Sequence, residues 1–325
     1  MASLRDPLPV RSITLPNRLW FPPVARDLAT ADGAVTDDNV EAYRKIAAGG
    51  VGTVVVEHCF VHPDGRFSAK QIGIDRDEAI AGLARIADVI RSCNAVPIAQ
   101  ISFAGPRTST GRKLGPSPVP LPGESTPAEP MTEEYIGRMP SLFEAATRRA
   151  LAAGFAGVEI HGAHGFLLSS FFSPLTNHRT DAYGGALQAR GRLALEVVAA
   201  ARRHASAQFL IGFRLGADDG QDGGLVPEDA AQLGRWLQEA GVDILSISGG
   251  LCGSRPARLS DRQGYFFPQA SIVKAGVSIP VVGVGGVTDP AAARDAVARG
   301  VVDLVAVGRR LMADPDWAAR ALSLQ

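Results

Sequence analysis

The feature that most constrains the fold is a repeated alternation of short apolar runs with longer helical segments. Eight of these runs are mostly apolar and have the residue types typical of β-strands. They are Leu19–Val24, Val51–Glu57, Pro97–Ile101, Phe155–Ile160, Phe209–Leu215, Ile244–Ser248, Val281–Val284 and Leu304–Val307. Eight parallel strands joined by helices close into a barrel. The sequence therefore predicts an α/β fold, a single-domain (β/α)8 TIM barrel over residues 1–325.

The helices predicted between these strands carry recognisable start and stop signals. They are Asp38–Ala48, Asp77–Arg91, Glu133–Ala153, Ala189–Arg203, Pro227–Ala240, Gln269–Ala275 and Asp289–Arg299. Asp289 followed by Pro290 is an N-cap with proline at the first helical position. Gly300 follows the last of these helices, where glycine favours termination.

Two connections are longer than ordinary βα loops. Residues 102–132 are rich in proline and glycine, and residues 249–267 contain several turn-forming glycines. Because loops longer than about 12–15 residues in a compact domain usually cover binding sites, we expect both to act as lids over the barrel mouth. The N-terminal segment Val10–Leu15 is expected to form a lid hairpin.

The composition excludes several classes of function. The chain has 33 Lys plus Arg and 33 Asp plus Glu, a net charge of +0, so nothing suggests nucleic acid or an acidic membrane as partner. Its three cysteines are far apart without a CxxC pair, which argues against a disulfide framework. No apolar run approaches the roughly 20 residues of a membrane span, and a signal-peptide core is absent from the N-terminus. We therefore expect a cytoplasmic protein with small-molecule partners, and leave a homo-oligomer open.

The most unusual chemistry follows the fourth predicted strand. The stretch EIHGAHGFLLSSFFSPLTNHRTDAYGG places His161 and His164 at the end of that strand, and in a parallel barrel the carboxyl ends of the strands form the active-site face. The two imidazoles have three interpretations: metal ligands, hydrogen-bond donors to a substrate oxygen, or structural residues. No third nitrogen or sulfur ligand stands at a familiar spacing, so no metal is predicted. Paired donors to a carbonyl oxygen fit better.

Glycine turns end the seventh and eighth predicted strands, in VVGVGG and LVAVGRR. These are the positions at which such barrels commonly bind phosphate. Gly285, Gly286 and Gly308 would let backbone N–H groups approach an anion, and Arg309 would add a planar set of donors. The alternative is that both are ordinary strand-to-helix turns.

Two further polar residues lie at predicted strand ends. Arg214, at the end of strand five, would stabilise negative charge that develops on a ligand, or would form a structural salt bridge. Gln100, in strand three, offers a donor and an acceptor to a planar heterocycle, or belongs to a satisfied polar layer of the barrel.

Together these residues resemble the old yellow enzyme family of FMN-dependent oxidoreductases. The resemblance runs from LPNRLWFPPVA to VDLVAVGRRLMADP, and its most specific part joins the HxxH pair to NHRTDAYGG. It implies an enzyme in which FMN, reduced by NADH or NADPH, passes hydride to the activated C=C bond of an α,β-unsaturated carbonyl compound held by His161 and His164. The cofactor-binding residues that it implies are Pro22, Pro23, Ala25, His58, Gln100, Arg214, Gly285, Gly286, Gly308 and Arg309.

Three departures limit what the resemblance implies. The family usually has a proton-donating tyrosine where this chain has Phe166, so another donor is needed. Tyr265 and Asp27, both expected to contact substrate, are candidates, together with His58 and water. Otherwise the reaction would end as a double-bond isomerisation or a dehydrogenation. Ala25 replaces the cysteine or threonine of many relatives, which predicts an altered flavin potential. The residues up to Gln325 also lack the cysteine cluster of the larger iron-sulfur members and the terminal arginine of some short ones.

A flavin-free barrel is the alternative from another class, either a phosphosugar lyase or isomerase, or a non-catalytic binder. A lyase of this kind would need a reactive lysine at a strand end. None of Lys45, Lys70, Lys113 and Lys274 is placed at one.

Overall fold

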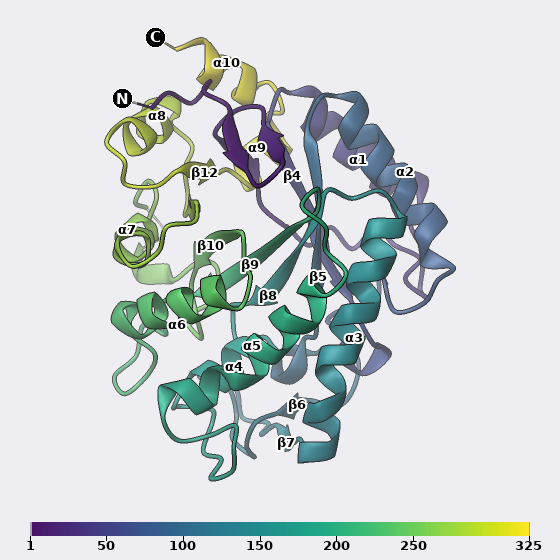
Figure 1. The fold of residues 1–325 in the computed structure, drawn as a ribbon, viewed down its shortest axis with the longest axis vertical. Coiled ribbons are helices and arrows are strands. Elements are labelled where there is room, and N and C mark those ends of the chain that lie inside the picture. Colours follow the sequence, from purple (N-terminus) through teal and green to yellow (C-terminus); the bar gives the residue numbers. More distant parts are fainter. Residues whose placement is uncertain (1, 260, 325) are drawn as a thin grey trace.

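Eight parallel strands close into a barrel in the order β10-β11-β12-β3-β4-β5-β8-β9 (Figure 1). The computed structural model describes residues 2–259 and 261–324; Met1, Ser260 and Gln325, which fall within the predicted barrel and lid segments, lie outside the described residues. The barrel strands are β3 (Leu19–Phe21), β4 (Thr53–Phe60), β5 (Val96–Ser102), β8 (Gly157–Gly162), β9 (Leu210–Gly216), β10 (Ile244–Ser248), β11 (Val281–Val284) and β12 (Leu304–Ala306). The predicted (β/α)8 fold is confirmed.

Helices surround this barrel and cover its outer face (Figure 1). Those that follow barrel strands are α1 (Asp37–Ala48), α2 (Ala79–Ser92), α3 (Glu133–Ala152), α5 (Leu187–Arg202), α6 (Pro227–Glu239), α7 (Phe267–Ala275) and α8 (Pro290–Ala298). Shorter helices are α4 (Leu167–Phe172), α9 (Arg309–Ala313) and α10 (Trp317–Ser323). The predicted cap at Asp289 is present, because its side chain accepts a hydrogen bond from Ala291 N.

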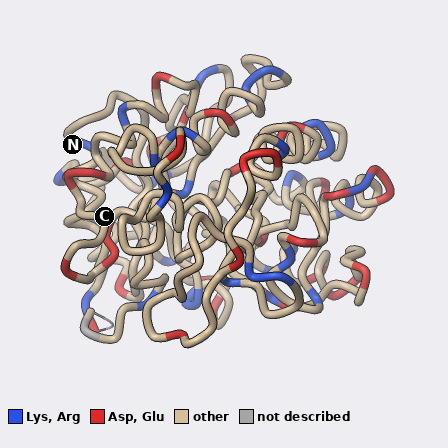
Figure 2. The backbone as a smooth tube through the Cα atoms, turned by 90° about the horizontal axis from the view of Figure 1, so that it is seen from below, with Lys and Arg blue, Asp and Glu red and all other residues tan. Residues whose placement is uncertain are grey.

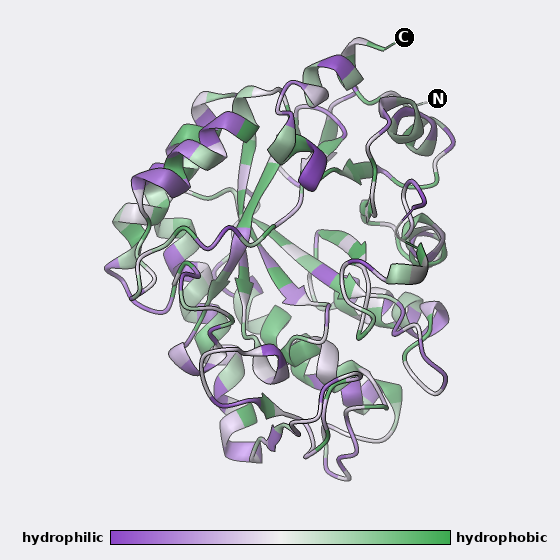
Figure 3. Cartoon of the chain, turned by 180° about the vertical axis from the view of Figure 1, so that it is seen from behind, coloured by the Kyte–Doolittle hydropathy of each residue, from purple (hydrophilic) through white to green (hydrophobic). Residues whose placement is uncertain are grey.

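The strands are mostly apolar because they are buried on both faces. Every residue of β4, β8 and β9 is buried, and Figure 3 shows the strands mostly in hydrophobic colours while the helices mix both. One large buried cluster lies between strands and helices, and a smaller one fills the barrel interior. Figure 2 shows basic and acidic residues scattered over the backbone, in keeping with the net charge of +0.

The N-terminal hairpin pairs β1 (Leu8–Val10) with β2 (Ile13–Leu15), as predicted. It is not a lid over the mouth, because Val10 and Leu15 pack into the interior cluster of the barrel. Ser12 N also donates to Ala207 O, just before the start of β9. The hairpin therefore closes the end of the barrel opposite the mouth, where its apolar side chains replace solvent.

The two long loops lie at the mouth. Residues 102–132 include the 3-10 turn η2 (Gly105–Arg107) and a parallel pair of two-residue strands, β6 (Leu114–Gly115) and β7 (Glu129–Pro130). Arg107 of this loop donates to Leu251 O of the second loop at 3.4 Å. None of the helices formed by the described residues combines the length and apolarity of a membrane span.

Candidate active site

A cavity of about 990 Å³ opens at the carboxyl ends of the barrel strands. It brings together most of the predicted site residues. Those that line it are Pro22, Pro23, Ala25, His58, Gln100, His161, His164, Phe166, Arg214, Tyr265, Gly286, Gly308 and Arg309. Residues from both ends of the chain, from Pro22 to Arg309, therefore share one wall, as expected for loops that follow parallel strands.

His161 and His164 form an imidazole pair where β8 ends. Their ring centroids are 5.2 Å apart with an interplanar angle of 74°. Burial is the first cause that lowers the pKa of each ring well below its usual value, and the nearby Arg214 guanidinium lowers both further. Both rings are therefore neutral at physiological pH and each has one N–H to donate.

The backbone directs these two rings by an abrupt turn at the strand end. His164 has a φ of 59°, a left-handed conformation that non-glycine residues rarely adopt. Its backbone N donates to Gly249 O at 3.0 Å, and its Nε2 lies 2.7 Å from Ser248 Oγ. Nδ1 of His161 is buried and has no hydrogen-bond partner among the described residues. That atom is therefore an unsatisfied polar group within the site, of the kind that a bound ligand can satisfy.

Arg214 presents a buried cation to the same cavity and forms no salt bridge among the described residues. It is 4% exposed, and its one side-chain hydrogen bond among the described residues is from Nη2 to Ser248 Oγ at 3.4 Å. Its Nε is buried without a partner. The structural salt bridge considered from the sequence is not formed within residues 2–259 and 261–324. An unpaired buried guanidinium is costly unless an anionic or polar ligand completes its hydrogen bonds.

Gln100 is oriented by a buried glutamate on the neighbouring strand. Its Nε2 donates to Glu159 Oε1 at 2.7 Å, so its own carbonyl oxygen remains as an acceptor for a bound molecule. Burial raises the pKa of Glu159 to about 7, against the opposing effect of Arg214. Gln100 is therefore bonded within the barrel and also lines the cavity.

Glycine turns and Tyr265 form the opposite end of the cavity. Gly285 and Gly286 have φ values of 131° and 62°. A Cβ on Gly285 would lie 2.7 Å from the Tyr265 ring, so glycine is required there. The Tyr265 hydroxyl donates to Ser254 O at 2.7 Å. Tyr265 therefore lies beside the glycine turns, and Gly285 is adjacent to the cavity without lining it.

An aromatic wall faces the imidazole pair. The Phe166 ring centroid is 4.3 Å from that of His161, and 5.5 Å from that of Phe67, on which it stacks with an interplanar angle of 24°. Phe67 was not predicted, because it belongs to a loop whose path the sequence pattern does not determine. This wall is apolar where the family usually has a phenol.

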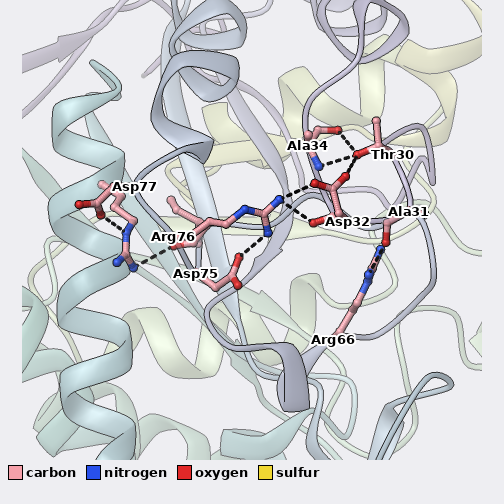
Figure 4. A network of polar contacts seen from close by, with 10 residues as sticks. Thr30, Ala31, Asp32, Ala34, Arg66, Asp75, Arg76 and Asp77 are labelled. Carbon is pink, nitrogen blue, oxygen red and sulfur yellow. Dashed lines mark hydrogen bonds and ion pairs between the residues drawn. The ribbon is translucent and has the colours of Figure 1, made fainter.

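A polar network holds the loop that carries Phe67. Arg66 donates from Nη1 to Ala31 O at 2.7 Å, and Arg76 donates from Nη2 to Asp32 Oδ2 at 2.9 Å (Figure 4). Thr30 bonds Asp32 and Ala34 in the same view. These bonds join the loop after β3 to the loop after β4, so the two loops support each other at the edge of the cavity.

One predicted substrate contact is not part of the cavity wall. Asp27 adopts a φ of 52°, and its Oδ1 accepts a hydrogen bond from Ser68 Oγ. The left-handed turn directs this carboxylate into the supporting loops. Cavity residues that the sequence did not indicate include Phe67, Arg107, Ser254 and Arg255. No group of three or more His, Cys, Asp or Glu side chains is placed to hold a metal in the part of the chain that the structure describes.

Comparison with known proteins agrees with this geometry. A profile of the NADH:flavin oxidoreductase / NADH oxidase family matches residues 3–323. The chain belongs to this family. The NADH oxidase of Thermoanaerobacter brockii is 36% identical over 321 residues, which cover 96% of this chain and 49% of that protein. The chain thus spans about half the length of this flavin oxidoreductase relative. The resemblance to the old yellow enzyme family is confirmed.

Shorter members of the NADH:flavin oxidoreductase family match over nearly their whole length. The NADPH dehydrogenase of Bacillus licheniformis is 35% identical over 317 residues, covering 97% of this chain and 92% of that protein. Among solved structures, a complex of 2-naphthoyl-CoA reductase with 2-naphthoyl-CoA superposes with a TM-score of 0.93 at 27% identity. The match covers 98% of this chain and 52% of that one. The flavin-free alternatives are therefore set aside.

The cavity residues fit FMN, the cofactor of this flavin oxidoreductase family. The unpartnered Nε of buried Arg214 is a donor suited to the polar edge of a flavin ring. Gly286, Gly308 and Arg309 line the far end, where a phosphate needs backbone N–H groups and a cation. The cavity volume of about 990 Å³ suits a ligand of cofactor size.

Proposed function

We propose that this protein is an FMN-dependent oxidoreductase that uses NADH or NADPH to reduce the activated C=C bond of an α,β-unsaturated carbonyl compound. The observation that carries the proposal is the placement of the neutral pair His161 and His164 in one cavity with the buried cation of Arg214. Membership of the NADH:flavin oxidoreductase / NADH oxidase family supports it.

The residues proposed to hold FMN lie at three parts of the cavity wall. Pro22, Pro23 and Ala25 would pack along the ring, with His58 and Gln100 at its edge. Arg214 would donate to its polar edge, and the glycine turns with Arg309 would hold the phosphate. The chemistry supplied by bound FMN is the acceptance of a hydride from NADH or NADPH and its delivery to the β-carbon of the substrate.

The imidazole pair would bind and polarise the substrate carbonyl. Because His161 and His164 are neutral, each donates an N–H to the carbonyl oxygen without exchanging a proton. These donors stabilise the negative charge that the oxygen gains as the C=C bond is reduced. Phe166 and Phe67 would pack beside the substrate.

No side chain at the described site takes the place of the missing phenol. Burial lowers the pKa of His58 to about 4, so at pH 7 roughly one molecule in a thousand has this ring as the imidazolium cation. The Tyr265 hydroxyl is bonded to Ser254 O beside the glycine turns, and Asp27 does not line the cavity. We therefore propose that water protonates the α-carbon.

Phe166 also favours a second candidate, a flavin-dependent double-bond isomerase or dehydrogenase. An isomerisation would add no net hydride or proton to the substrate, so it would need no donor to the α-carbon. A phenyl ring at this position would slow protonation and so favour that outcome.

One experiment separates the two activities. The FMN-loaded protein is mixed anaerobically with NADH or NADPH and with an unsaturated ketone, aldehyde or coenzyme A thioester, and the products are analysed. The thioester is included because the 27% identical structure is of a 2-naphthoyl-CoA reductase. We expect saturated product with one NAD(P)H consumed per C=C bond. Isomerised product without net NAD(P)H consumption would replace the reductase with the second candidate.

A further inference from the structure

His58 is a third imidazole in the cavity wall with no established role. It lies on β4, where the pairing with β5 is irregular between Val56 and Cys59. Its ring is packed edge-on against both Phe67 and Phe166, at 5.4 Å between centroids in each case. The His161 ring is 6.3 Å away. His58 therefore stands beside the proposed substrate-binding pair, within the aromatic wall.

The neighbouring side chain of Gln71 can adopt only one amide orientation. Phe67 N donates to Gln71 Oε1 at 2.6 Å, and a backbone N–H can only donate. Gln71 Nε2 donates to the backbone O of His58, and a carbonyl oxygen can only accept. Both bonds would be lost if the amide were reversed. The Gln71 NH2 group therefore faces His58.

This orientation determines which nitrogen of His58 carries the proton. Gln71 Nε2 lies 2.7 Å from His58 Nδ1. Since the amide nitrogen donates, Nδ1 must accept, and the proton of a neutral imidazole must then be on Nε2. Burial lowers the pKa of His58 to about 4, which keeps the ring neutral. Nδ1 is the only ring nitrogen with a protein partner among the described residues, so Nε2–H is left for a ligand.

We propose that Gln71 is a positioning residue that holds His58 as an Nε2–H donor to a carbonyl oxygen of a molecule bound in the cavity. The identity of that molecule rests on the proposed function: the oxygen belongs either to the flavin ring or to the unsaturated substrate. The opposite tautomer would present a lone pair instead, and would repel a carbonyl oxygen. Gln71 itself is buried and does not line the cavity.

The tautomer can be measured directly, without turnover. In protein labelled with 15N-histidine, long-range 1H–15N spectra distinguish Nε2–H from Nδ1–H rings, and the His58 signals are assigned by their loss in His58→Phe. We expect His58 to be in the Nε2–H form. In Gln71→Glu the carboxylate can only accept, so the proton should move to Nδ1. In Gln71→Met, which removes all the bonds, both tautomers should be populated.

Matched controls keep this measurement interpretable. Gln238, on the outer helix α6, accepts from Ser278 N at 2.8 Å, so Gln238→Glu makes the same chemical change far from the cavity and should leave His58 unaltered. Circular dichroism and urea unfolding verify folding of each variant. An Nδ1–H ring in the native protein, or unchanged His58 signals in both Gln71 variants, would overturn the proposal.

Two further measurements identify the acceptor. If it is a flavin carbonyl, His58→Phe and Gln71→Met should both shift the absorbance and reduction potential of the holoenzyme without substrate. If the acceptor is the substrate, the absorbance and reduction potential of the flavin should stay unchanged. The kcat/KM should then fall about tenfold, the effect of one lost hydrogen bond. Unchanged values in both measurements would refute the donor role. The tautomer of His58 is measured without turnover. A failure to reduce the C=C bond would therefore count against the proposed function and not against the assignment of the tautomer.

Discussion

Replacing Arg214 by methionine should have opposite effects on the apoprotein and on cofactor binding. The guanidinium is 4% exposed, has an unpartnered Nε and forms no salt bridge among the described residues. Burial lowers its pKa against the opposing effect of the Glu159 carboxylate, the direction expected for a cation that has lost its hydration. Methionine has a similar length and carries no charge. The substitution therefore removes a destabilising buried charge from the apoprotein, and it removes a hydrogen-bond donor from the complex with FMN.

The expected magnitudes follow from the contacts of this side chain. Exchanging a buried ionic group for an apolar one is often neutral or stabilising by about 1–4 kcal/mol. Because Arg214 keeps one hydrogen bond, to Ser248, we expect the apoprotein to gain about 1–2 kcal/mol. Glu159, with a pKa raised to about 7, can take up a proton when the cation is removed. A hydrogen bond to a charged group contributes about 1.5–3 kcal/mol, so FMN should bind about 10- to 150-fold more weakly.

Urea unfolding of the apoprotein and titration of FMN fluorescence measure the two effects separately. Arg202→Met is the matched control, because Arg202 donates to Asp243 at 2.6 Å and lies outside the cavity. Removing that arginine should lower the free energy of unfolding by about 1 kcal/mol or more and leave FMN affinity unchanged. If Arg214→Met destabilises the apoprotein as Arg202→Met does, or binds FMN as tightly as the native chain, the reasoning is refuted.

Other predictions concern the imidazoles and the aromatic wall. Phe166→Tyr should raise enone turnover at least about tenfold if water is the native proton source; unchanged turnover in stopped-flow assays would show that an efficient donor already exists. His161→Ala should lower kcat/KM for enones by about 10²–10³-fold through loss of an oxyanion donor, and a change below about threefold would count against its role. The pKa of His58 is lowered in the folded state to about 4 from 6.5, so the unfolded chain binds more protons between these values. Stability should therefore fall as pH drops from about 6.5 to about 4, and His58→Phe should reduce that dependence in urea titrations.

The barrel was predictable because its physical cause is local in the sequence. Buried strands require mostly apolar runs. The helices between them carry caps, and the structure confirms the cap at Asp289. The carboxyl ends of parallel strands meet at one face whatever the details of the loops. Residues at strand ends, such as His161, Arg214 and Gly286, were therefore expected in one cavity, and the structure places them there.

Only the tertiary structure decided which loop residues join them and which way their polar groups point. Phe67 reaches the cavity because Arg66 bonds Ala31, far back in the chain, while Asp27 bonds Ser68 outside the cavity wall. The hairpin predicted as a lid closes the other end of the barrel. Gln71 meets His58 across 13 positions. Such contacts depend on the paths of the loops. Hydrogen bonds between residues far apart in the chain determine these paths, and local propensity does not encode them.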